Sequence, residues 1–255
     1  MEIVATKMPE NEKSVQIPIP KKIWSISLIA GITLWIIGIV LWKEQGIDEI
    51  VLFYYNTARI ECQPIVLIMQ WITSYGMAVI AGIYVVYLLL SQVRKDLEAP
   101  LSIYLFAICS LGLSGIAGDL LKEVFARPRP ITTYGSEIFV LSQSVTPAIP
   151  SGHATKSIAL VLPFILLTAS ANNLNRVLKT MMIVISLGVC YSRIVLGVHY
   201  LSDVLAGIGM AILGFPFTMM IANMILKQTK AEQLPMLSKV WGVLLIFLIV
   251  IFMII

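Results

Sequence analysis

Long runs of apolar residues dominate this chain of 255 residues, and short segments between the runs hold most of the charged side chains. An α-helix needs about 20 apolar residues to cross the hydrocarbon core of a bilayer. The pattern therefore predicts spans at about 24–42, 65–90, 101–121, 154–171, 180–198 and 203–226. A seventh, weaker run at 239–255 is just long enough to cross.

Composition supports a membrane protein. Hydrophobic residues make up 58% of the chain, against about 45–50% in a soluble domain. We therefore predict an all-α fold: a polytopic membrane helix bundle with a six-helix core and a seventh, C-terminal transmembrane helix. The N-terminal tail has mixed charge and no small-residue cleavage site follows the first run, which we expect to be retained as a span.

Basic residues alternate between the two predicted sides. One set of loops carries Lys7, Lys13, Lys21, Lys22, Arg94, Lys95, Arg176, Lys179, Lys227, Lys230 and Lys239. The other loops carry Lys43, Arg59, Lys122, Arg127, Arg129, Lys156 and Arg193. The positive-inside rule makes the larger set cytoplasmic. We thus expect a multi-pass protein of the cell (inner) membrane, with a cytoplasmic tail at 1–22 and the second set on the outer, periplasmic face.

The stretch "GIDEIVLFYYNTARI" at 46–60 follows the first span on the outer side. Its amphipathic character is compatible with a segment lying in the membrane interface, with Tyr54 and Tyr55 at headgroup level. An ordinary ordered loop is the equally open alternative.

Neither cysteines nor net charge point to a metal or to nucleic acid. Cys62, Cys109 and Cys190 are widely spaced, and the chain has only two histidines, which are also far apart. No zinc-binding pattern results. We expect no metal, no cofactor and no nucleic-acid partner, and the sequence leaves the oligomeric state open.

Three short segments on the predicted outer side hold both histidines: "KEVFARPRP" (122–130), "PSGH" (150–153) and "SRIVLGVHYLSD" (192–203). Ionisable groups at membrane depth are costly, and they mark functional sites by default. We therefore treat the three segments as parts of one site.

The basic residues of this site suit a phosphate. Lys122, Arg129 and Arg193 supply positive charge and N–H donors, and guanidinium groups match phosphate oxygens. Ser151 at a helix N-cap followed by Gly152 would present backbone N–H groups to an anion. These five residues are the predicted phosphate-binding set.

The remaining polar residues suit phosphoryl transfer. His199 and Asp203 are four residues apart, hence on one helix face, so the carboxylate can orient the imidazole. His199 is the predicted nucleophile and His153 the general acid and base. A serine nucleophile at Ser151 is the weaker rival, because Ser151 and His153 would not face each other on a helix.

Taken in order, these residues resemble the type 2 phosphatidic acid phosphatases. The family pattern K-x6-R-P matches Lys122, Arg129 and Pro130; P-S-G-H matches 150–153; and S-R-x5-H-x3-D matches 192–203, with every fixed position filled. The resemblance covers a motif-bearing core at about 100–226, within an expected membrane-embedded phosphatase domain at 23–236. The predicted extra helix, 237–255, lies outside it.

The resemblance implies a six-helix core with the site near the outer surface, and the same catalytic and phosphate-binding roles. Arg127 also precedes a proline, and either a contact with the substrate headgroup or a water-facing position is open. Asp119, three residues before Lys122, either positions that lysine or is an interfacial carboxylate without a role.

The predicted function is an integral-membrane lipid phosphatase that uses a phosphohistidine without a metal. Its substrate would be a lipid phosphate that reaches the site from the bilayer: phosphatidic acid, phosphatidylglycerophosphate, polyprenyl diphosphate or lipid A. A lipid phosphotransferase with the same intermediate, and a non-catalytic scaffold or transporter, are the alternatives.

Overall fold

A computed structural model describes residues 20–94, 97, 101–139, 146–168 and 172–227, together with positions 240, 243, 244 and 247. Within these ranges the chain is mainly helical and contains no strand. The helices are α1 (Lys21–Glu44), α2 (Gly46–Glu61), α3 (Gln63–Val93), α4 (Leu101–Phe125), α5 (Pro130–Tyr134), the 3-10 helix η1 (Gly135–Glu137), α6 (Gly152–Leu167), α7 (Asn173–Val195) and α8 (Leu201–Lys227).

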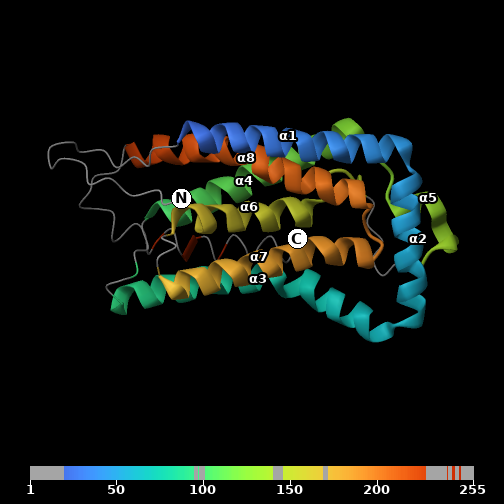
Figure 1. The fold of residues 1–255 in the computed structure, drawn as a ribbon, viewed down its shortest axis with the longest axis horizontal. Helices are drawn as coiled ribbons and strands as arrows, with labels where there is room; N and C mark the ends of the chain where they lie inside the picture. The colour runs from blue at the N-terminus through green and yellow to red at the C-terminus, as the bar shows by residue number, and fades with distance from the viewer. Residues whose placement is uncertain are drawn as a thin grey trace.

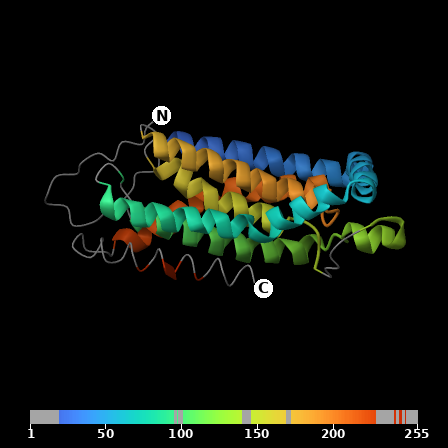
Figure 2. The same cartoon turned by 90° about the horizontal axis from the view of Figure 1, so that it is seen from below.

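The long helices lie side by side along one axis (Figures 1 and 2), with α1 along α8 and α3 along α7. Helix α6 is central, because it contacts α3, α4, α7 and α8. Helix α2 runs across one end of the bundle, and α5 lies at the same end (Figure 1). The helix that follows the P-S-G-H segment is thus surrounded by other helices.

The predicted fold class is confirmed: the protein is an all-α bundle with membrane-spanning helices. Five helical segments of the described chain are long and apolar enough to span a bilayer, in the regions of α1, α3, α4, α7 and α8. Helix α6 is apolar but has 16 residues. The predicted tail at 1–22 and the predicted span at 239–255 lie almost entirely outside the described residues.

One span begins earlier than expected, and one of the two alternatives left open for 46–60 is decided. The span expected to begin at residue 180 begins at Asn173, because Asn172 caps the helix by accepting a hydrogen bond from the Leu174 N–H at 2.8 Å. Hydropathy marks the apolar part of a helix, whereas its end is set by the cap. The stretch at 46–60 is helical in α2 and not a loop.

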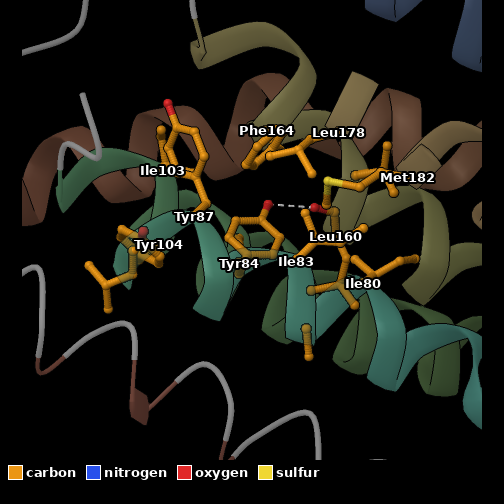
Figure 3. Close-up of a cluster of buried hydrophobic side chains, with 14 of the residues drawn as sticks. Ile80, Ile83, Tyr84, Tyr87, Ile103, Tyr104, Leu160, Phe164, Leu178 and Met182 are labelled. Atoms are coloured by element: carbon orange, nitrogen blue, oxygen red, sulfur yellow. Dashed lines mark hydrogen bonds between the residues drawn. The ribbon is translucent and has the colours of Figure 1, made fainter. Parts of the chain in front are cut away.

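Aliphatic side chains and a few aromatic rings form the core between α3, α4, α6 and α7 (Figure 3). The rings of Tyr84 and Tyr87 both contact Phe164 edge to face. The buried Tyr84 hydroxyl donates a hydrogen bond to the Leu160 carbonyl oxygen at 2.7 Å. A buried tyrosine needs such a partner, so this contact fixes α3 against α6.

Glycines allow α1 and α8 to approach closely. A Cβ atom at Gly209 would lie 2.9 Å from the Gly31 carbonyl oxygen and from the Trp35 nitrogen. A Cβ atom at Gly38 would lie 2.9 Å from the Ser202 carbonyl oxygen. Small residues at such crossings are typical of membrane helices, where close packing drives association. They place the start of α8 against α1.

We expect Gly209→Ala to destabilise the protein by about 1–3 kcal/mol, because the new methyl group meets backbone atoms that cannot rotate away. Gly214→Ala is the matched control on the same helix, since its Cβ atom would lie 4.0 Å from the nearest atom, Leu113 Cδ2. Thermal unfolding in detergent measures both. Equal unfolding temperatures for the two variants would contradict close packing at Gly209.

Candidate active site

The three segments that carry the motifs meet at the end of the bundle where α2 lies. The Ala148 N–H donates to the Arg127 carbonyl oxygen at 2.8 Å, which joins the first segment to the second. The Ser151 N–H donates to the Asp203 carbonyl oxygen at 2.9 Å, which joins the second to the third. Residues far apart in sequence therefore form one site.

His199 lies in the connection between α7 and α8, with a side chain only 2% exposed. Its Nδ1 is 3.3 Å from Asp203 Oδ2, and its Nε2 is 3.3 Å from an Arg129 guanidinium nitrogen. Helix α8 begins at Leu201, so His199 precedes it instead of sharing a helix face with Asp203 as expected. The predicted pairing of the two side chains is nevertheless present.

Two side-chain partners of His199 favour one tautomer, and the Ala148 backbone is a further hydrogen-bond partner of the ring. A guanidinium N–H can only donate, so Nε2 of His199 must be the acceptor toward Arg129. The proton of a neutral imidazole then lies on Nδ1 and points to Asp203. The lone pair of Nε2, the nucleophilic nitrogen of the ring, therefore faces the guanidinium of Arg129.

Burial lowers the pKa of His199 well below its usual 6.5, and the positive charges of Arg129, Arg193 and Lys122 lower it further. The imidazole is therefore neutral at physiological pH. A neutral imidazole is the form that can attack phosphorus.

Asp203 is completely buried. Its Oδ1 accepts a hydrogen bond from Arg127 at 2.6 Å, and its Oδ2 accepts one from the Tyr200 N–H at 2.9 Å. A buried carboxylate must be paired in this way to remain ionised. Asp203 is thus held in one orientation, with Oδ2 directed at His199.

The predicted phosphate-binding residues surround the start of α6. Ser151 is the N-cap, and its buried hydroxyl has no hydrogen-bond partner among the described residues. The same holds for Nε of Arg193, whose guanidinium also donates to Thr73 Oγ1 at 2.7 Å. Lys122 Nζ would lie 3.5 Å from a Cβ atom at Gly152. Unsatisfied buried donors beside a helix N-terminus suit an anion.

Arg129 links the predicted phosphate site to the nucleophile. Beside its contact with His199, it donates to the Thr146 carbonyl oxygen at 2.7 Å and to the Thr146 hydroxyl at 2.9 Å. These bonds hold a guanidinium that is 8% exposed in one position. The charge next to His199 is therefore preorganised.

His153 is the second residue of α6 and is partly exposed. It interacts electrostatically with Arg193 and His199, as well as with Lys156 and Arg129. The structure thus brings both histidines of the chain to the same site. This is the arrangement that a nucleophile and a separate general acid require.

Arg127 differs from what the sequence suggested. Its side chain is 4% exposed and donates to Asp48 Oδ2 at 2.8 Å as well as to Asp203. The ring of Tyr200 covers it, with the guanidinium carbon 4.0 Å from the ring centroid. The water-facing alternative is therefore wrong, and these contacts give no support to a headgroup contact.

Of two acidic residues at this end of the bundle, Asp119 is exposed and Asp48 is buried. Asp119 lies 3.2 Å from Lys122 Nζ but is 74% exposed, so the pair contributes little. Sequence reasoning missed Asp48, which is buried and enters the site through Arg127. Its signal was a polar residue on the buried face of α2, in line with Leu52 and Asn56.

Among the described residues, no cluster of three or more His, Cys, Asp or Glu side chains could hold a metal ion.

An all-α membrane bundle with a buried histidine beside basic residues is the arrangement that the sequence predicted for a membrane phosphoryl-transfer protein. The model of the PAP2 superfamily matches residues 101–227, which include all three motifs. The chain belongs to this superfamily.

One solved structure is similar in fold: a transmembrane PAP2-type phosphatidylglycerolphosphate phosphatase from Bacillus subtilis. The TM-score is 0.55 and the sequence identity 20%, over 76% of this chain and 96% of that chain. No curated protein matches this chain.

We expect the ring of His199 to titrate below pH 6.5, because burial and the adjacent cations oppose its protonation. Nuclear magnetic resonance of histidine-labelled protein can measure this. Only two histidines are present, so a His153→Gln variant assigns the signals. A midpoint at or above pH 6.5 for His199 would contradict the lowered pKa.

Proposed function

We propose that this protein hydrolyses a lipid phosphomonoester or terminal diphosphate through a phosphohistidine on His199. The observation that carries the proposal is the setting of the imidazole. Asp203 holds its Nδ1 side, and its Nε2 lone pair faces Arg129 next to the unsatisfied donors at the start of α6. Phosphate and nucleophile would therefore be adjacent.

In the first step Nε2 of His199 attacks phosphorus, and the bond between phosphorus and the lipid oxygen breaks. His153 must be protonated at this point to donate a proton to the departing oxygen. Burial and the nearby positive charges, Arg193 first, lower the pKa of His153 in the free protein, and the negative charge of a bound phosphate opposes that shift. Lys122, Arg129 and Arg193 offset the charge of the phosphoryl oxygens. Asp203 stabilises the positive charge that His199 acquires.

In the second step a water molecule attacks the phosphohistidine. His153, now neutral, accepts a proton from this water, and the bond between phosphorus and Nε2 breaks. Inorganic phosphate leaves and both histidines return to their starting forms. Since the cationic side chains supply the charge stabilisation, the scheme routes no step through a metal.

We propose that the substrate approaches sideways from the bilayer, because the site lies at the end of an apolar bundle whose outward faces carry large exposed apolar side chains. Candidates are phosphatidic acid, phosphatidylglycerophosphate, polyprenyl diphosphate and lipid A. The fold likeness to a phosphatidylglycerolphosphate phosphatase makes that lipid phosphate the first to test. The alternation of basic loops supports a site on the outer face of the cell membrane, with the N-terminus cytoplasmic.

We expect purified protein in detergent to release phosphate from one of these lipids. His199→Ala should lower kcat more than about 10³-fold, as loss of a catalytic nucleophile does elsewhere. Glu61→Gln, an exposed residue at the end of α2, is the control. Full activity of a folded His199→Ala variant would exclude the mechanism. Phosphate release only with an added acceptor, accompanied by a phosphorylated acceptor, would identify a transferase instead.

We also expect activity to survive a metal chelator and to be inhibited by vanadate. The cationic side chains replace a metal in the scheme, and vanadate adopts the five-coordinate geometry of phosphoryl transfer at a histidine. Phosphate release with and without each reagent is the measurement. Loss of activity in chelator that Mg²⁺ restores would contradict the first expectation, and normal activity in excess vanadate the second.

A further inference from the structure

Asp48 is a buried carboxylate that belongs to none of the three motifs. It lies in the first turn of α2, outside the region 101–227 that matches the PAP2 superfamily, and is 1% exposed. Burying a carboxylate is costly unless it is paired and hydrogen-bonded. The groups that pair with Asp48 therefore show what it holds in place.

Asp48 contacts the two partners that flank Asp203. Its Oδ2 accepts a hydrogen bond from the Arg127 guanidinium at 2.8 Å and another from the Ser202 hydroxyl. Its Oδ1 accepts one from the Ser202 N–H at 2.9 Å. The other terminal nitrogen of Arg127 donates to Asp203 Oδ1 at 2.6 Å. One guanidinium thus bridges two carboxylates, with a different nitrogen on each.

Because the two terminal nitrogens of Arg127 bind different carboxylates, only one of them binds Asp203. This determines which oxygen of Asp203 is available to His199. A guanidinium facing a single carboxylate tends to bind both oxygens with two parallel N–H bonds. Such a fork on Asp203 would engage Oδ2, which now accepts from the Tyr200 N–H and lies 3.3 Å from Nδ1 of His199. While Asp48 binds the second nitrogen, Arg127 reaches only Oδ1.

We propose that Asp48 is a positioning residue for phosphoryl transfer: it holds Arg127 so that Oδ2 of Asp203 remains available to orient His199. The proposal rests on the proposed function, because it assigns Asp48 a role relative to His199 as nucleophile. Within the described part of the chain, the hydrogen bonds and ion pairs of Asp48 go to Arg127 and Ser202 and to none of the predicted phosphate-binding residues. Its effect passes through Arg127 and Asp203.

A purely structural role is the competing explanation. The hydrogen bond from the Ser202 N–H means that Asp48 also caps the N-terminus of α8. Loss of a cap would lower stability. It would not change the tautomer of His199, nor would it affect kcat in the fraction of protein that stays folded.

The first test is the kinetics of Asp48→Asn, which keeps the shape of the side chain and removes its charge. We expect kcat to fall about 10- to 100-fold, the usual loss when a partner behind a functional histidine is removed, with KM little changed. Glu49→Gln is the matched control: the neighbouring carboxylate, which accepts a hydrogen bond from the Tyr134 hydroxyl at 2.9 Å, loses the same charge. A kcat for Asp48→Asn equal to that of Glu49→Gln, per folded molecule, overturns the proposal.

The second test is spectroscopic and needs no turnover. Nitrogen chemical shifts of labelled histidine report which ring nitrogen carries the proton. We expect protonated Nδ1 in the wild type and in Glu49→Gln, and a mixture of tautomers at His199 in Asp48→Asn. An unchanged wild-type tautomer in Asp48→Asn shows that Asp48 only supports the fold.

A double-mutant comparison identifies the path of the effect. If Asp48 acts through Arg127, adding Asp48→Asn to an Arg127→Met variant changes neither kcat nor the His199 tautomer further. Additive effects overturn the path through Arg127. The two proposals fail separately: activity in His199→Ala removes the proposed function, whereas an inactive His199→Ala beside a fully active Asp48→Asn removes only the role of Asp48.

Discussion

The active-site end of this bundle depends on the pairing of buried charges. Moving an ion out of water costs several kcal/mol, and close, well-directed partners must repay that cost. Arg127 meets this requirement by lying between Asp48 and Asp203, both of which are almost fully buried. The same contacts join the start of α2, the end of α4 and the start of α8. The contacts that balance these buried charges therefore also set the geometry of the site.

The predicted phosphate site shows the complementary feature, positive groups without full pairing. The hydroxyl of Ser151 and Nε of Arg193 are buried with no partner among the described residues. Ser151 is the N-cap of α6, and Arg193 interacts electrostatically with His153 in the first turn of that helix. Unsatisfied buried donors are costly in a folded protein. A bound phosphate would accept hydrogen bonds from these groups. The cost of leaving them without partners would then be removed, which would favour binding of the substrate.

Helix α2 supports the site from outside the motif-bearing region. Its first turn holds Arg127 through Asp48, and its last turn holds the α7–α8 connection through Arg59, which donates to the Val195 carbonyl oxygen at 2.7 Å. Gly197 adopts a φ of +67° in that connection, and a Cβ atom there would lie 2.7 Å from the Arg59 guanidinium. The loop that carries His199 therefore takes its shape against a helix that no motif includes.

Local patterns in the sequence were sufficient to locate the six long helices of the described bundle and to single out the motif residues. Apolar runs report helices because membrane crossing is a property of one contiguous segment, and Ser151 was recognisable as a cap from its immediate neighbours. The partners of Arg127 and the role of α2 were decided only by the tertiary structure. Asp48 and Arg127 are 79 residues apart. No local pattern specifies which buried charges will meet, since that depends on how the helices pack.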